Sequence, residues 1–313
     1  MADDFTIKAE EIEVLQCKPG CILGGPKKEA FSCCFEGKNY LIQVQQIGGR
    51  ITKISTSDDS TVNELYRLFN LLDEYQEIFN GQFIPISKMQ FTGQNEDELK
   101  HAAHELTTRR LTMYQSVDFV QGAQSELIDS FSYLTEDSFG KWMELSKELD
   151  IIHAMFLYNT ADIGVAIDLR CANLIELFEP MAELIGQYNA FFPTLNTEDR
   201  NTSLKMCLDA VFSWFATDIF EREFSTSKDR FLKMLVWSRN RIMHIKRNQG
   251  SDKYLSGEES LLYCVKLSLL YRRILLELLG VNYQQYKDSL KKTIAQWEHH
   301  EGVFDNFLAV KLC

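Results

Sequence analysis

The chain has 313 residues, of which 45% are hydrophobic and 25% are charged. These values are ordinary for a globular protein and exclude a disordered or collagen-like chain. The net charge of -12 and the pI near 5.1 argue against a general nucleic-acid binder, because phosphate would be repelled over most of the surface. Any RNA chemistry must therefore be local.

Membrane insertion is not expected. The most apolar run, residues 261–281, is interrupted by Arg272, Arg273 and Glu277, so it falls short of the roughly 20 apolar residues that a spanning helix needs. The first residues, Met1 to Asp4, lack the basic and apolar regions of a secretory signal. We therefore expect a cytoplasmic protein without membrane contact.

Eight cysteines are scattered along the chain, which is typical of reduced cytosolic thiols rather than of a disulfide framework. Four of them could be imagined as zinc ligands, but their spacing fits no common zinc pattern, and strand cysteines on two faces are the simpler interpretation. These four are Cys17, Cys21, Cys33 and Cys34. We expect neither a metal ion nor a cofactor.

The first 60 residues contain short alternating or β-branched runs separated by glycine and proline turn signals, which predict a small antiparallel sheet. The runs are Phe5 to Ile7, Phe31 to Phe35, Tyr40 to Ile47 and Ile51 to Ile54. A helix is expected from Val62 to Phe79, where apolar residues recur at helical spacing after Ser60 or Thr61 as a cap. The polar stretch 92–97 is the expected boundary of this β-rich domain, which would span residues 1–95.

Residues 96–313 are predicted to form an all-α domain. The expected helices are 96–130, 136–160, 162–190, 202–223, 227–247, 258–279 and 283–299. The fold class is therefore α+β, a small β-rich N-terminal domain followed by a helical bundle.

Positive charge is concentrated in one segment of this acidic chain. Residues 225–253 contain eight basic and two acidic residues, a net charge of +6, so the remainder carries -18. A local basic site could contact phosphate at short range. The alternative is a basic helix paired with acidic neighbours, for which the sequence offers Glu221, Glu223, Glu258 and Glu259.

Within this basic segment, the expected helix 227–247 carries Arg239, Asn240 and His244. Asn240 and His244 are four residues apart and share a face, whereas Arg239 lies about 140° from His244 around the axis, within reach of a long side chain. An opposed apolar stripe would bury the helix, with Trp237 and Met243 at its margins. The stripe comprises Phe231, Leu235, Ile242 and Ile245.

An arginine, a polar residue, three further residues and a histidine, on a helix of an all-α C-terminal domain, resemble the motif of HEPN ribonucleases. The resemblance covers about residues 165–300, and Arg239 to His244 is its sharp part. A β-rich N-terminal domain with Leu65-Tyr66-Arg67-Leu68-Phe69 and Asn80-Gly81-Gln82-Phe83 before it is similar to the ApeA-like antiphage HEPN proteins.

The resemblance implies a metal-independent endoribonuclease that acts as a toxin or antiphage effector by abortive infection. His244 would accept the proton of a ribose 2'-hydroxyl, which attacks the neighbouring phosphorus and leaves a 2',3'-cyclic phosphate. Arg239 would stabilise the charge of the transition state. Asn240 would orient His244 or a phosphate oxygen.

Flanking phosphates would contact Arg241, Lys246 and Arg247 without reading sequence. The resemblance also implies a homodimer that pairs two motifs across a two-fold axis. The N-terminal domain would receive a phage or host trigger. Some HEPN toxins are silenced by nucleotide transfer to a tyrosine two residues after the histidine, but Lys246 stands at that position, which puts this control in doubt.

A second function remains open, a non-catalytic helical module that uses Arg239 and His244 to bind a partner or to dimerise. His101 and His104, three residues apart, could share a metal ion, although a solvated helix face is the simpler interpretation. His299 and His300 are expected at the surface.

Overall fold

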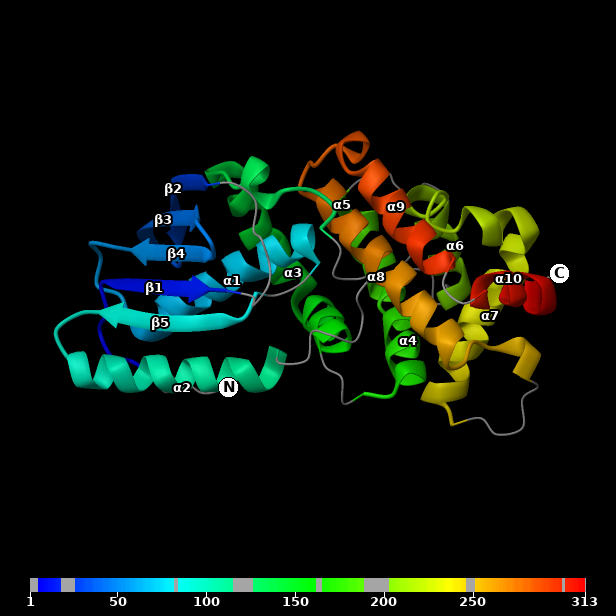
Figure 1. The fold of residues 1–313 in the computed structure, drawn as a ribbon, viewed down its shortest axis with the longest axis horizontal. Helices are drawn as coiled ribbons and strands as arrows, with labels where there is room; N and C mark the ends of the chain where they lie inside the picture. The colour runs from blue at the N-terminus through cyan, green and yellow to red at the C-terminus, as the bar shows by residue number, and fades with distance from the viewer. Residues whose placement is uncertain are drawn as a thin grey trace. The chain divides into compact units, whose positions relative to one another are not determined.

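A computed structural model describes residues 5–17, 26–81, 84–114, 126–161, 165–188, 203–245, 251–299 and 302–312. Its contacts divide into two units, one built on a sheet and one built of helices. The sheet unit lies within residues 1–116 and 129–146, and the helical unit comprises the remainder. The two units appear in Figure 1, coloured along the chain. The predicted α+β class is confirmed.

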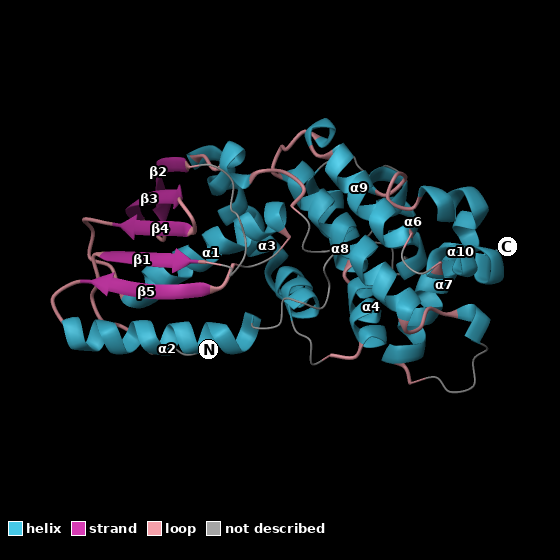
Figure 2. Ribbon diagram, in the orientation of Figure 1, coloured by secondary structure: helices cyan, strands magenta, loops and turns pink. Residues whose placement is uncertain are grey.

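The sheet unit contains a five-stranded antiparallel sheet among its described residues, in the order β2-β3-β4-β1-β5. Burial alternates along β1 and β4, as expected for strands with one face against a core. Figure 2 shows the strands as one layer. Their bounds are β1 (Glu11–Gln16), β2 (Lys27–Phe35), β3 (Lys38–Gln46), β4 (Arg50–Ser55) and β5 (Ile86–Thr92).

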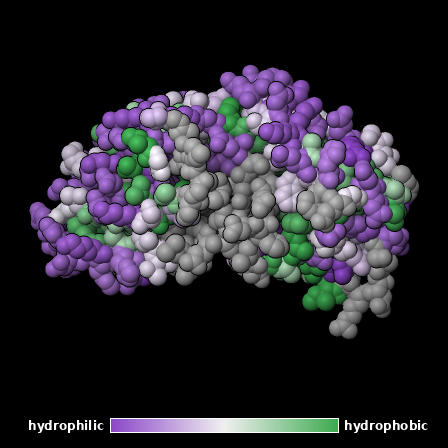
Figure 3. All heavy atoms as spheres, viewed as in Figure 1, coloured by the Kyte–Doolittle hydropathy of each residue, from purple (hydrophilic) through white to green (hydrophobic). Residues whose placement is uncertain are grey.

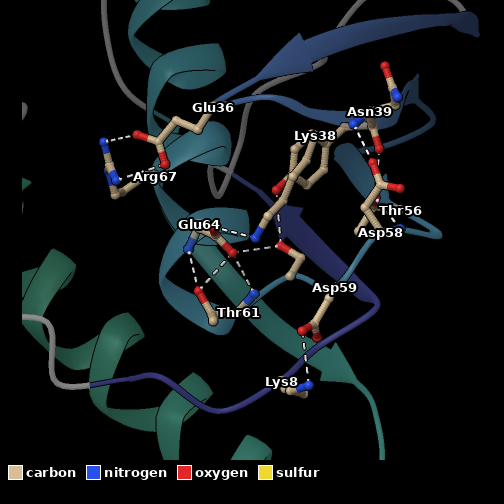
Figure 4. A network of polar contacts seen from close by, with 12 residues as sticks. Lys8, Glu36, Lys38, Asn39, Thr56, Asp58, Asp59, Thr61, Glu64 and Arg67 are labelled. Carbon is tan, nitrogen blue, oxygen red and sulfur yellow. Dashed lines mark hydrogen bonds and ion pairs between the residues drawn. The ribbon is translucent and has the colours of Figure 1, made fainter.

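Helix α1 (Val62–Asn80) packs against β1 and β4. It begins with a capping box, in which the backbone N–H of Glu64 donates to Thr61 Oγ1 (3.3 Å) and the backbone N–H of Thr61 donates to Glu64 Oε2 (2.8 Å). Lys38 Nζ donates to the other oxygen of Glu64 (2.6 Å), which ties the cap to the β2–β3 hairpin (Figure 4). Gly81, at φ 73°, ends the helix in the left-handed conformation that glycine favours.

Helix α2 (Glu96–Tyr114) packs on β5 and belongs to the sheet unit. Leu99, Ala102, Ala103 and Leu106 form a buried helical stripe, and this stripe is the physical reason why the helix stays with the sheet. The boundary predicted at residue 95 therefore does not coincide with the division of contacts. Residues 93–95 of this polar stretch connect β5 to α2 within the sheet unit.

In α3 (Glu136–Ala161) the helical geometry is interrupted at Asp150 (φ 32°). The division between the units falls just before this kink, so the last part of α3 belongs to the helical unit. The other helices of that unit are α4 (Ile167–Glu176), α5 (Phe178–Tyr188), α6 (Leu204–Phe215), α7 (Glu221–Met243), α8 (Glu258–Leu278), α9 (Lys287–Glu298) and α10 (Val303–Phe307).

Helix α8 is buried along most of its length, and α4 packs against both α7 and α8. None of the helices in the described ranges combines the length and the apolar composition that crossing a bilayer requires. Hydrophilic residues predominate on the face drawn in Figure 3, with apolar residues in small groups between them.

Several sequence expectations were wrong in detail, since the helix expected at 202–223 ends at Phe215 and the helix expected at 162–190 is divided into α4 and α5. Phe5 to Ile7 is not a strand, whereas the unpredicted β1 is a central strand that pairs with both β4 and β5. Ile245 was placed in the buried stripe but is 79% exposed, because the helix ends at Met243 and Ile245 adopts a left-handed backbone (φ 46°) that turns it outward.

Candidate functional site

The motif lies at the C-terminal end of α7. Phe231, Leu232, Met234 and Leu235 bury one side of this helix, and Ser238 receives a hydrogen bond from the backbone N–H of Leu255 (2.8 Å). His244 is the C-cap, with its backbone N–H donating to the carbonyl of Asn240 (3.1 Å), and its side chain is exposed. The end of the helix thus presents the histidine to solvent on a well-packed support.

Arg239 is held by Glu176, the last residue of α4. The guanidinium donates through Nε to Glu176 Oε2 (2.5 Å) and through Nη2 to Oε1 (2.6 Å), the two-bond fork that suits arginine. The side chains are 19% and 30% exposed. The hydrogen bonds from the guanidinium to Glu176 raise the pKa of Arg239, so Arg239 is a fixed cation.

The Nη1 group of Arg239 contacts the other two residues of the motif, Asn240 and His244. Nη1 of Arg239 donates to Asn240 Oδ1 (2.8 Å) and contacts His244 Nε2 at 3.3 Å. A guanidinium has no acceptor, so Nε2 is the acceptor and the imidazole proton lies on Nδ1 in this arrangement. The long arginine side chain thereby spans the angle of about 140° that separates the two positions on a helix.

One donor of Arg239 remains. A guanidinium has five N–H groups, and four of them are used by Glu176, Asn240 and His244. The fifth, on Nη2, has no hydrogen-bond partner within the described ranges. An arginine oriented by a carboxylate, with a free N–H beside an exposed imidazole, can bind a phosphate oxygen next to a group that transfers protons.

Arg241 is engaged within the chain. Its guanidinium stacks on the ring of Tyr254 at 3.9 Å and lies 3.8 Å from Asp168 Oδ2. Asp168 in turn accepts hydrogen bonds from the backbone N–H of Gly257 (2.9 Å) and from Ser260 Oγ (2.7 Å). The role of Arg241 as a phosphate contact stays a prediction. Lys246 and Arg247 lie outside the described residues.

The carboxylates around the motif were not foreseen. The sequence suggested glutamates at 221, 223, 258 and 259, whereas the partners observed for the cations of α7 include Glu176, Asp168, Asp209 and Asp229. Glu179, near Glu176 and Arg239, has a raised pKa, chiefly because of burial and also because of the charge of Glu176. The only sequence signal for Glu176 and Glu179 was their place in an otherwise apolar helical segment.

A second ionic cluster lies at the other end of α7. Lys266 Nζ of α8 donates to Glu223 Oε1 (2.5 Å) and to Glu298 Oε1 (2.7 Å), and Tyr263 donates to Glu223 (3.0 Å). The side chains of Lys266 and Glu223 are 0% exposed. Burial raises the pKa of Glu223, and the charge of Lys266 opposes that rise.

The other candidates of the sequence do not assemble into a site. His101 and His104 are exposed on α2, with His101 Nε2 3.4 Å from Glu105 Oε1, and His299 is exposed. Cys33 is buried and Cys34 exposed, while Cys21 and His300 lie outside the described residues. In the part of the chain that the structure describes, no three histidine, cysteine or acidic residues are grouped to hold a metal ion.

The family model of the Apea-like HEPN domain matches residues 190–285. The match contains α6, α7, α8 and the whole Arg239 to His244 motif, but not Glu176 or Asp168. Comparisons with curated proteins and with solved structures gave no significant match.

Proposed function

We propose that this chain, whose residues 190–285 match the model of the Apea-like HEPN domain, is an endoribonuclease that cuts RNA without a metal ion. The single observation that carries the proposal is the 3.3 Å contact between Arg239 Nη1 and His244 Nε2 at the exposed end of α7. It places a fixed cation beside a proton acceptor.

In the proposed reaction the ribose 2'-oxygen attacks the adjacent phosphorus while its proton passes to Nε2 of His244. The bond from phosphorus to the 5'-oxygen then breaks, and that oxygen takes a proton from solvent, which gives a 2',3'-cyclic phosphate and a 5'-hydroxyl end. The imidazolium of His244 releases its proton to solvent, which restores the site. Arg239 stabilises the negative charge on the phosphate oxygens of the transition state. To accept the proton, Nε2 must first exchange its contact with Arg239 for the substrate hydroxyl.

The other residues assist this step. Asn240 accepts a hydrogen bond from Arg239 and so keeps Nη1 beside His244. Glu176 fixes the guanidinium plane from the opposite edge. Arg241, Lys246 and Arg247 are proposed to contact flanking phosphates, which would give affinity without sequence preference.

We further propose that two copies combine their motifs in a homodimer. The support is the exposed apolar end of α7, where Met243 is 36% and Ile245 79% exposed beside His244. From the match to the Apea-like HEPN model we also propose that the chain is a cytoplasmic antiphage effector, released by a trigger that acts on the sheet unit. The proposed homodimer is supported by this match and by the exposed end of α7, whereas the proposed trigger is supported by the match alone.

One observation favours the alternative of a non-catalytic binding module. Four of the five donors of Arg239 are already paired within the chain, as in many structural arginines. A structural arginine needs no neighbouring imidazole open to solvent, however, and His244 is exposed. This openness is the reason why we favour catalysis.

Cleavage of labelled cellular RNA by the purified chain, compared with that by His244→Ala, tests the proposal. We expect the substitution to reduce cleavage by at least about 100-fold, since general-base catalysis typically contributes about 10²- to 10⁴-fold. The products of the parent should carry 2',3'-cyclic phosphate ends. Because His244 is exposed, the free energy of unfolding should change by less than about 0.5 kcal/mol.

The matched control is His101→Ala, which removes an exposed histidine of the sheet unit and should leave cleavage unchanged. Expression adds a second readout, because the parent should slow host growth and His244→Ala should not. Equal cleavage and equal growth for the parent and His244→Ala would contradict the proposed ribonuclease activity and favour the non-catalytic binding module.

A further inference from the structure

Trp237 lies on the same exposed stripe of α7 as the proposed general base. Lys233, Trp237 and His244 are exposed and follow one another at spacings of four and seven residues, which places them on one face of the helix. Trp237 as a whole residue is 38% exposed. Seven residues of helix separate Trp237 from His244 by about 10 Å, a distance that a nucleotide neighbouring the scissile phosphate can cover.

A single exposed aromatic residue is common on protein surfaces, so exposure alone decides nothing. What distinguishes Trp237 is its place between cations, with Lys233 one turn before it and Arg241 one turn after it. Lys233 is 49% exposed and shares Asp229 with Lys205, so this carboxylate serves two cations. An aromatic ring interleaved with basic side chains is the arrangement by which proteins bind single-stranded nucleic acid.

We propose that Trp237 is a base-stacking subsite, which holds an unpaired base next to the phosphate that is cleaved. This inference rests on the proposed function and narrows its substrate to single-stranded RNA, because a base can stack on a protein ring only when it has left a duplex. Every base can stack on an indole ring, so the subsite would favour single-stranded RNA over duplex RNA without a preference for sequence.

A second copy of the chain is the competing occupant of this face. A two-fold contact centred on Trp237 would bring Lys233 of each copy near the like charges of the other, which opposes association. RNA supplies the opposite charge. The apolar residues Met243 and Ile245, beyond the motif, offer a self-contact that does not need Trp237.

The test measures binding rather than cleavage. The full chain with His244→Ala is titrated into a short fluorescein-labelled single-stranded oligoribonucleotide of mixed sequence and, separately, into the same sequence as a duplex. Adding Trp237→Ala should weaken single-strand binding by roughly 5- to 150-fold, the usual effect of losing one stacking platform. Trp237→Phe should lose less, and duplex binding should not change.

Trp214→Ala is the matched control, because Trp214 is a 51% exposed tryptophan on a different helix, and its loss should leave both affinities unchanged. Light scattering and urea unfolding accompany each variant. Unchanged single-strand binding by Trp237→Ala overturns the inference, as does an equal loss for the duplex. A shift of the oligomeric state with the loss of binding assigns Trp237 to the self-contact instead.

The two proposals fail separately. Cleavage that depends on His244 but not on Trp237, together with unchanged binding, overturns the stacking subsite alone. Single-strand binding that depends on Trp237, by a chain whose parent cuts no RNA, leaves the subsite standing and overturns the ribonuclease. A chain that binds no RNA overturns both.

Discussion

The two ends of α7 use the same chemistry for opposite purposes. Before the kink at Ser227, Glu223 forms an ionic cluster with Lys266 that is closed to solvent, with the rings of Phe304 and Phe220 at 4.6 and 5.0 Å from the ammonium nitrogen. After it, the pair of Arg239 and Glu176 remains partly open and touches an exposed histidine. Complete burial indicates a structural cluster, whereas a pair that is fixed but open can act on a ligand.

The largest expected effect is at the closed end. Lys266→Met removes the only cation that contacts Glu223 in the described residues and leaves a buried carboxylate uncompensated. We expect a loss of about 3 to 5 kcal/mol in the free energy of unfolding, measured with urea. Lys233→Met, which breaks the exposed pair with Asp229 on α7, is the control and should cost less than about 1 kcal/mol in the free energy of unfolding. Similar losses of unfolding free energy in the two variants would show that the buried cluster of Lys266 and Glu223 is no more important for stability than an exposed pair.

At the open end the effect should appear in catalysis. Glu176→Gln keeps the shape of the side chain but loosens Arg239, so we expect kcat to fall about 10- to 100-fold, as for other weakened transition-state donors. KM for RNA should also fall, because a negative charge near the phosphate is removed. Steady-state cleavage assays measure both constants, and Glu183→Gln, an exposed neighbour on α5, should change neither. A fall in stability of several kcal/mol would instead make Glu176 a structural partner.

The buried residue His153 tests whether burial alone keeps a histidine neutral. His153 Nδ1 lies 3.1 Å from the Tyr271 hydroxyl, and burial lowers the pKa of His153 to about 3. Between pH 6.5 and 3, His153 is therefore protonated in the unfolded chain but neutral in the folded chain. The stabilising contribution is complete above pH 6.5 and is lost as the pH falls, by up to about 1.4 kcal/mol per unit.

Urea unfolding of the parent and of His153→Gln at several pH values measures this contribution, because the variant lacks it while the other acidic groups contribute equally to both. The difference between the two curves should shrink as the pH falls from 6.5. His101→Gln, at an exposed position, should follow the parent. Parallel curves for the parent and His153→Gln would mean that this position is open to water.

The smallest expected effect concerns Arg241. Arg241→Lys keeps the charge but loses the planar stack on Tyr254, so the free energy of unfolding should fall by about 0.5 to 1 kcal/mol. Arg241→Met also removes the charge. If Arg241 contacts phosphate, this second variant should weaken RNA binding and reduce its salt dependence by about one ion. An unchanged salt dependence would limit Arg241 to holding Tyr254 and Asp168.

Helical periodicity predicted α8 and the part of α7 that follows the kink at Ser227, because each carries a long apolar stripe that only a helix aligns. The strand β1 was missed although Ile12 and Val14 alternate with glutamates, since two apolar residues are a weak signal outside their sheet. The end of α7 was also missed. Sequence spacing cannot show that the backbone turns left-handed at Ile245, a β-branched residue that rarely adopts this conformation.

Arg239 and His244 were found because they are local, five residues apart on one helix. Glu176 was not found because it precedes Arg239 by 63 residues and meets it only through the packing of α4 on α7. Pairing over such a separation leaves no periodic trace in one sequence. Local spacing therefore revealed the chemical groups, and tertiary packing supplied what orients them.

The place of α4 has a practical consequence for anyone who shortens this protein. A fragment cut to the matched residues 190–285 would keep the whole motif yet lose Glu176 and Asp168, the carboxylates that hold Arg239 and Arg241. Its guanidinium groups would be free to rotate, and the fragment would carry an excess of positive charge that invites unselective binding of RNA. The smallest piece that preserves the geometry must begin before Ile167, where α4 starts.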